Sequence, residues 1–264
     1  MKPGIHTLTN AEYHASPGIS KTGLSMFKTD PASLEWSRNC PEDDEVMATD
    51  IGDAIHAALL EPDRYAAEYV VAPKFDRRTT VGKENAAIFE HANQGKVILD
   101  AEQGKMVSLI QGSAMAHPTA RFLLQAPGTV EDSIYWEDPD TGELCKMRAD
   151  KRLHDHPIIV DVKSVQSLDQ FQRQLEEFGY WLQDGMYSEG YERHFGETPG
   201  FLFLVVQTSR ALKRYPVAVF ELDQQSKAEG RAEFRRLLDA YHDAKVRGEF
   251  PGVQTISRPY WAKR

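Results

Sequence analysis

The chain has 264 residues, 41% of them hydrophobic and 27% charged, a composition typical of a folded domain with a full core. Lysine and arginine total 31 against 40 aspartate and glutamate, and the net charge of −9 argues against a protein that coats nucleic acid. A nucleic-acid enzyme with clustered basic residues is still allowed. No apolar run is long enough to span a bilayer, no signal-peptide segment opens the chain, and its two cysteines lie far apart. We therefore expect one elaborated cytoplasmic domain over residues 1–264.

The first 128 residues are predicted to be mainly helical. Ser20 is a predicted N-cap for a short helix that ends before Pro31. The N-terminus of this helix, with Ser20 and Lys21, could hold a phosphate, although a plain helix cap is the commoner explanation. The acidic residues 39–46 follow as a predicted surface loop.

A second helix is predicted over residues 49–60, before Glu61-Pro62. Gly52 and His56 lie four residues apart and share a face of this helix, so the small residue allows close approach beside the imidazole. A single helical histidine is usually structural or solvated, so His56 gains weight only together with the hairpin described below.

Residues 72–83 form the most basic stretch, with Lys74, Arg77, Arg78 and Lys83 spaced to grip phosphates along a backbone. A solvated loop is an equally good interpretation. Further helices are predicted over 84–93 and 101–116, the second with Asp100 as its N-cap.

The remaining pattern predicts a sheet core over about 129–222 and a C-terminal helix and tail over 223–264. Strands are expected over 129–136, 201–207 and 215–222, and helices over 169–195 and 223–247. Glu131, on the first strand, either extends an acidic cluster or faces solvent. This order of elements indicates an α/β fold with a central mixed β-sheet flanked by helices.

Residues 143–163 are predicted to form a β-hairpin, because two apolar runs flank the turn-like residues 154–157. If these four residues are the loop, Leu153 pairs with Ile158 and Asp150 lies opposite Asp161. Directly opposed carboxylates, about 5 Å apart, repel each other unless a cation lies between them.

Two carboxylates with open positions suit Mg²⁺. Side chains alternate along a strand, so Lys163 shares a face with Asp161 and would lie beside the metal. There the lysine can stabilise charge or orient an attacking water. The hairpin therefore predicts a metal-dependent phosphodiesterase centre.

The sequence Asp150, then Asp161-Val162-Lys163, then a helix with Gln183 and Tyr187, resembles the PD-(D/E)xK nuclease superfamily. Upstream, residues 52–56 resemble the GxxxH motif of its RecB-like branch, and residues 183–187 resemble the QxxxY motif. A single DxK triplet is common by chance, whereas these elements in this order are far more specific.

Several other stretches extend the resemblance over nearly the whole chain. The residues at 19–24, 130–136, 180–191, 214–216 and 261–263 are similar to the C-terminal nuclease domain of RecE-type exonucleases (exodeoxyribonuclease VIII), in the branch that includes phage lambda exonuclease. This implies the PD-(D/E)xK nuclease fold and Mg²⁺-dependent 5′→3′ digestion of duplex DNA from its ends. It also implies 3′ single-stranded tails for a RecT-like annealing partner in recombination, and a homo-oligomeric ring, with a tetramer favoured over a trimer.

The resemblance also implies a two-metal site, in which Mn²⁺ can replace Mg²⁺. His56, Asp150, Asp161 and the backbone carbonyl of Val162 would be the ligands. Imidazole is a less usual ligand for a hard cation, so His56 is included because of the resemblance.

Lys163 would activate the attacking water, and Gln183 and Tyr187 would orient Lys163 or the scissile phosphate. Glu131 is a further catalytic candidate. Contacts with the DNA backbone or a 5′-phosphate are expected from Ser20, Lys21, Arg77, Arg78, Lys83 and Arg148.

Two other functions are also compatible with the sequence. Another PD-(D/E)xK enzyme, such as an endonuclease, would cut a closed circle, whereas an exonuclease needs an end. A catalytically inactive DNA-binding relative is the other alternative. The joint presence of Asp150, Asp161 and Lys163 argues against it.

Overall fold

The computed structural model describes residues 1–38, 51–211, 213–251, 253 and 255–259. The predicted acidic loop at 39–46, the first two residues of the helix predicted over 49–60, and the 261–263 stretch lie outside the described residues. Within these ranges no helix combines the length and hydrophobicity needed for a membrane span.

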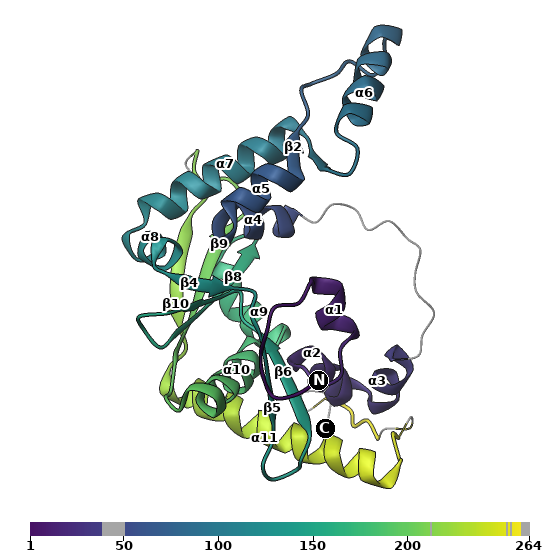
Figure 1. Cartoon of the computed structure of the whole chain (residues 1–264), viewed down its shortest axis with the longest axis vertical. Helices are drawn as coiled ribbons and strands as arrows, with labels where there is room; N and C mark the ends of the chain where they lie inside the picture. Colours follow the sequence, from purple (N-terminus) through teal and green to yellow (C-terminus); the bar gives the residue numbers. More distant parts are fainter. Residues whose placement is uncertain (39–50, 212, 252, 254, 260–264) are drawn as a thin grey trace.

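Helices lie before, between and after the strands in the chain (Figure 1). They are α1 (Asn10–Ala15), α2 (Lys21–Thr29), α3 (Pro31–Ser37), α4 (Ile51–Leu60), α5 (Pro62–Glu68), α6 (Thr80–Ala92), α7 (Ala101–Ala116), α8 (Pro118–Gln125), a 3₁₀ turn η1 (Leu168–Gln170), α9 (Phe171–Glu177), α10 (Tyr180–Phe195) and α11 (Gln224–Arg247). The predicted N-caps Ser20 and Asp100 are confirmed, because each side chain accepts a hydrogen bond from the backbone three residues on.

The strands form three sheets, of which the five-stranded one is central. They are β1 (Gly4–His6), β2 (Tyr69–Val71), β3 (Val97–Leu99), β4 (Gly128–Val130), β5 (Ser133–Glu137), β6 (Leu144–Arg148), β7 (Lys151–Leu153), β8 (Ile158–Val165), β9 (Gly200–Gln207) and β10 (Val217–Glu221). The central sheet has the order β10-β9-β8-β7-β4, with β8 and β9 parallel and the other neighbours antiparallel. Sheet β1-β5-β6 is antiparallel, and β2 and β3 form a parallel pair.

Both faces of the central sheet are covered, which confirms the predicted α/β fold with flanking helices. Helices α10 and α11 pack against one face and α4, α7 and α8 against the other (Figure 1). Along β9, Phe203 and Val205 join the first core, and Leu204 and Val206 join the second. A strand buried on both faces needs apolar residues at every position, which explains the continuous apolar run of β9.

The strands on either side of residues 138–142 both pass from one sheet to another. β4 and β7 belong to the central sheet, whereas β5 and β6 belong to the three-stranded sheet. The pairing Gly128↔Leu153 and Ser133↔Arg148 keeps one register across the break, so no residue is inserted. Glu131 has a left-handed backbone (φ 52°), and its N–H donates to the Asp150 carbonyl at 3.2 Å. The continuous strand predicted over 129–136 is therefore wrong at Glu131, and the first arm of the hairpin predicted over 143–163 is interrupted at Asp150.

The single helix predicted over 169–195 is also wrong. α9 ends at Glu177, and Gly179 has the left-handed backbone (φ 61°) that often terminates a helix. The chain then starts again as α10, which changes direction so that Gln183 reaches the central sheet.

α10 and α11 approach each other closely because two glycines meet at their contact. A Cβ on Gly185 would lie 2.3 Å from the Gly230 carbonyl carbon, and one on Gly230 would lie 2.1 Å from the Trp181 carbonyl oxygen. We expect Gly185→Ala to lower the free energy of unfolding by about 1–3 kcal/mol or more, through overpacking. The matched control is Gly112→Ala in α7, because a Cβ added there would have no atom of the described residues within 4 Å. There alanine should stabilise by up to about 1 kcal/mol. Chemical denaturation measures both changes, and equal effects would contradict the close packing.

Asp184 is a buried carboxyl on α10. Ser188 Oγ donates to Oδ1 at 2.9 Å, while Oδ2 finds no hydrogen-bond partner among the described residues. Burial raises the pKa of Asp184 to about 6, so the stability from its protonated form is present at low pH and is lost as pH rises through about 6.

We expect Asp184→Asn to be more stable than the wild type at pH 8, by about 2–3 kcal/mol, and similar to it at pH 4. Asparagine keeps the acceptor for Ser188 but carries no charge. Melting temperatures over this pH range test the prediction, with the exposed Asp239→Asn of α11 as control. A stabilisation by Asp184→Asn that is the same at both pH values would contradict it.

Candidate active site

Strand pairing brings three carboxylates close together: Glu131 at the bend between β4 and β5, Asp150 at the bend between β6 and β7, and Asp161 on β8. The pairs Lys151↔Val160 and Arg152↔Ile159 confirm the predicted hairpin register, and one further step along it, just beyond the end of β7, corresponds to Asp150 opposite Asp161. On the other side of β7, the register with β4 and β5 places Glu131 opposite Asp150. The site is therefore organised by strand pairing around the bend.

His56 of α4 joins two of these carboxylates. Its Nε2 lies 3.1 Å from Asp150 Oδ2, and its Nδ1 lies 3.7 Å from Glu131 Oε1. Burial alone would lower the pKa of His56, but the hydrogen bond and charge of Asp150 raise it above the ordinary value. For Asp150, burial alone would raise the pKa. The hydrogen bonds from His56 and from the Val162 N–H (2.7 Å) outweigh burial and lower it.

Asp161 and Lys163 project from β8 toward α10. Lys163 Nζ lies 2.6 Å from Asp161 Oδ2, and Gln183 Nε2 donates to Asp161 Oδ1 at 2.5 Å. Burial raises the pKa of Asp161 to about 6, with the Lys163 charge opposing and the Asp150 charge adding to the shift. Burial disfavours the charged form of Lys163, but the Asp161 and Asp150 charges raise its pKa above the ordinary value. Gln183 therefore contacts Asp161 rather than Lys163.

Tyr180 and Tyr187 lie on α10, the helix that carries Gln183, and line the same side of the site. Lys163 Nζ lies 4.7 Å from the centre of the Tyr180 ring, within range of a cation–π contact. Tyr187 is half-buried and lines the cleft, and burial raises its pKa well above the ordinary value.

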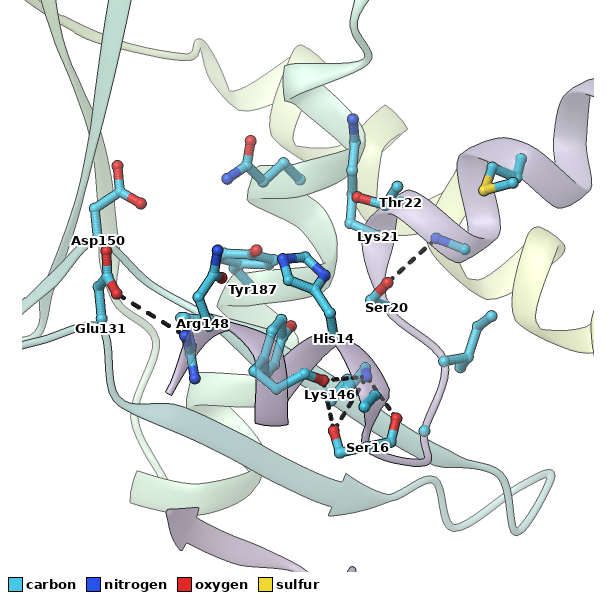
Figure 2. Close-up of a pocket in the computed structure, with 18 of the residues that line it drawn as sticks. His14, Ser16, Ser20, Lys21, Thr22, Glu131, Lys146, Arg148, Asp150 and Tyr187 are labelled. Carbon is cyan, nitrogen blue, oxygen red and sulfur yellow. Dashed lines mark hydrogen bonds and ion pairs between the residues drawn. The ribbon is translucent and has the colours of Figure 1, made fainter. Parts of the chain in front are cut away.

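Apart from the buried Asp161, the side chains described above line a cleft of about 1320 Å³. Figure 2 shows Glu131 and Asp150 on one side of it, and Ser20, Lys21 and Thr22 of α2 on the opposite side. Although the chain is acidic, the cleft has several cationic side chains in its lining: Lys21, Arg38, Arg64, Lys146, Arg148, Lys163 and Lys245. Two of these cations pair with carboxylates outside the lining, Arg64 with Glu61 and Lys245 with Glu143, whereas Arg148 and Lys163 lie beside Glu131 and Asp161.

Of the predicted DNA contacts, Ser20, Lys21 and Arg148 line this cleft. The Ser20 side chain accepts from the Gly23 N–H at 3.2 Å as a helix cap, and Arg148 is held by Ser133 and by the Leu8 carbonyl (2.8 Å). Burial and the nearby Lys163 charge lower the pKa of Lys21 to about 8.

Arg77, Arg78 and Lys83 are not brought to the cleft. They belong to the 72–79 loop and to α6, which stands apart from the sheet core (Figure 1). Arg77 pairs with Glu90 at 2.7 Å and Arg78 with Asp76 at 3.0 Å. Contact between these residues and DNA stays a prediction.

The cleft also contains residues that the sequence did not single out. Lys146 Nζ donates to the Tyr13 and Ser16 carbonyls, both at 2.7 Å, and burial lowers its pKa to about 8. His14 of α1 lies nearby (Figure 2). Strand alternation places Lys146 on the face of Arg148, which was an available signal, whereas nothing in the sequence marks His14 as close to them.

The side chains present suit a divalent cation. Their donors are carboxylate oxygens with one imidazole, and Asp161 Oδ2 is buried with the Lys163 ammonium 2.6 Å away. In the part of the chain that the structure describes, they form ion pairs rather than a chelating group of three or more His, Cys, Asp or Glu. His56, Asp150, Asp161 and the Val162 carbonyl could therefore hold the metal, and their roles stay predictions.

The chain belongs to the family described as "PDDEXK-like domain of unknown function" (DUF3799), whose model matches residues 28–254. The predicted resemblance to PD-(D/E)xK nucleases is thus confirmed, and the domain has their fold. PD-(D/E)xK nucleases generally use divalent metals.

Among solved structures, the chain is similar to a "Putative exonuclease" from Eubacterium rectale, with 15% identity and a TM-score of 0.59 over 90% of this chain and 88% of that one. It also matches a phage related exonuclease from Haemophilus somnus 129PT at 14% identity, over 64% of this chain and 84% of that one. The TM-score there is 0.31, too low to infer a shared fold. A comparison with curated proteins finds no significant match.

Proposed function

We propose that this protein is a Mg²⁺-dependent exonuclease that digests duplex DNA from its ends in the 5′→3′ direction. The observation that carries the proposal is the group of Asp150, Asp161 and Lys163: Asp150 and Lys163 line a cleft with several cations, and the buried Asp161 contacts Lys163. Opposed carboxylates fit a metal that binds phosphate, and the surrounding cations fit a DNA backbone.

The metal would be held by Asp150, Asp161, His56 and the Val162 carbonyl. When bound there, Mg²⁺ would supply Lewis-acid stabilisation of the charge that develops on the phosphate and the leaving oxygen. The Asp150 carboxylate is set up for this ligand role, because contacts with His56 and the Val162 N–H fix its position and favour its charged form.

Lys163 is the group placed to act on the nucleophile. Its ammonium is held between the Asp161 carboxylate and the Tyr180 ring, where it can orient a water for in-line attack on phosphorus. As the water oxygen bonds to phosphorus, the bond from phosphorus to the 3′-oxygen of the 5′-terminal nucleotide breaks. That nucleotide is released with a 3′-hydroxyl, the remaining strand keeps a 5′-phosphate, and the water's proton passes to solvent, which protonates the leaving oxygen. Gln183, on α10, positions Asp161 by donating a hydrogen bond to its Oδ1.

The polarity, the partner and the assembly follow from the RecE-type resemblance. Digestion of one strand leaves a 3′ single-stranded tail, which a RecT-like annealing protein would take up in recombination. A homo-oligomeric ring, with a tetramer favoured, would enclose the duplex in a channel lined by the basic residues while its exterior stays acidic.

The experiment that tests this function compares a linear duplex with a covalently closed circle of the same sequence, each with Mg²⁺ or EDTA. We expect loss of the linear duplex with Mg²⁺ only, and an intact circle. A nicked circle would favour the endonuclease alternative. No cleavage of either substrate with Mg²⁺ or Mn²⁺ would favour the inactive DNA-binding relative.

A further inference from the structure

Phe178 exposes an aromatic ring beside the cleft. It lies between α9 and α10, and 49% of the residue is exposed to solvent. A half-exposed phenylalanine gains little from burial, so a ring held there is available to a ligand.

The backbone at Phe178 is fixed from the cleft side. Lys21 Nζ, which lines the cleft, donates to the Phe178 carbonyl at 2.5 Å. The next residue, Gly179, has a left-handed backbone that a side chain would strain, and its carbonyl accepts from the Gln183 N–H at 3.2 Å. The ring therefore projects from a turn that is tied to both α2 and α10.

A continuous series of rings joins Phe178 to the catalytic lysine. The Phe178 and Tyr180 ring centres are 5.8 Å apart, and the Tyr180 ring is the one that contacts Lys163 at 4.7 Å. Tyr180 is itself held from behind by Phe171 and Phe203, at 5.9 Å each. Phe178 is thus two contacts from the group that acts on the scissile phosphate.

We propose that Phe178 stacks on an unpaired base of the strand being cut and so positions the nucleotide next to the scissile phosphate, with Tyr180 as the rigid support of its ring. This inference rests on the proposed nuclease function and adds a positioning residue to it. A base has an apolar face and a phenylalanine ring stacks on any of the four, so the contact suits a nuclease without sequence preference. The cations of the cleft would hold the phosphates on one side of the nucleotide while Phe178 holds the base.

The test measures the affinity for a duplex oligonucleotide with a short unpaired 5′ end, by fluorescence anisotropy in EDTA, where no cleavage occurs. We expect Phe178→Ala and Phe178→Leu to weaken binding roughly 5- to 150-fold, the range for losing one stacked base. Phe178→Trp should retain the wild-type affinity, because it keeps an aromatic face.

A second readout detects the contact itself. With 5-iodouracil placed at the unpaired end, irradiation should cross-link the oligonucleotide to Phe178, as located by mass spectrometry. In Mg²⁺ the alanine variant should raise KM for linear duplex more than it lowers kcat, since Phe178 does not touch the metal ligands.

The matched control is Phe122→Ala, because Phe122 on α8 is 48% exposed but its ring contacts His156 and not the Tyr180 ring beside Lys163. Binding by this variant should equal that of the wild type. If Phe178→Leu binds like the wild type, or if Phe122→Ala weakens binding equally, the stacking proposal is overturned. A wild-type protein that neither binds nor cuts DNA would overturn the proposed function as well.

Discussion

Asp161→Ala is expected to abolish DNA cleavage, with at least about a 10³-fold loss of kcat, while the protein stays folded. Asp161 is the carboxylate nearest Lys163 and one of two that face each other across β7 and β8, so its loss removes a predicted metal ligand. The fold should survive, because burial raises the pKa of Asp161 to about 6 and its charged form therefore costs stability at neutral pH. Cleavage rates and melting temperatures in EDTA measure the two effects.

The control for this change is Asp155→Ala, because Asp155 is an exposed carboxylate in the turn between β7 and β8. Its variant should cleave at the wild-type rate. Wild-type cleavage by Asp161→Ala would remove Asp161 from the site. An unfolded Asp161→Ala variant would show instead that the carboxylate is structural.

Lys163→Ala is expected to lose turnover by about 10²- to 10³-fold while it keeps its affinity for metal and DNA. Lys163 approaches Asp161 as a cation and is not a metal ligand, so calorimetric titration with Mn²⁺ should give a near-normal dissociation constant. Its pKa is raised by the Asp161 and Asp150 charges, so the lysine should be charged throughout the neutral range.

The exposed Lys105→Ala on α7 is the matched control and should leave turnover unchanged. If Lys163→Ala lost metal binding or failed to fold, the lysine would be a structural partner of Asp161. If it kept wild-type turnover, the water-positioning role would be wrong.

The register of the central hairpin was predictable because a one-residue shift would move every apolar side chain to the wrong face. A four-residue turn between two apolar runs then predicted Asp150 opposite Asp161, and the observed pairs Lys151↔Val160 and Arg152↔Ile159 have the register that this requires. The helix starts marked by Ser20 and Asp100 were readable for a similar local reason, since a cap depends on neighbouring residues only.

Long-range geometry was not predictable in the same way. The bend at Glu131 depends on a left-handed backbone at a non-glycine residue, which no local pattern indicates. The approach of His14 and Lys146 depends on how α1 packs against β6, across more than 100 residues of chain. The basic stretch at 72–83 had the right chemistry for DNA, but the sequence could not show that it would form an outlying arm with α6.

Gly179 was visible in the sequence as a glycine, yet the helical pattern over residues 169–195 favoured one long helix. Helical propensity is a weak guide where a single left-handed residue can redirect the chain. That turn places Gln183 against Asp161 and exposes Phe178.

The proposed activity is metal-dependent digestion that starts at the 5′ end of a duplex. Its most direct test is a time course on linear duplex DNA, labelled in separate samples at the 5′ and the 3′ ends, with Mg²⁺ or EDTA. We predict early release of the 5′ label and a retained 3′ label with Mg²⁺, and no release in EDTA. Early release of the 3′ label, or release that continues in EDTA, would contradict it.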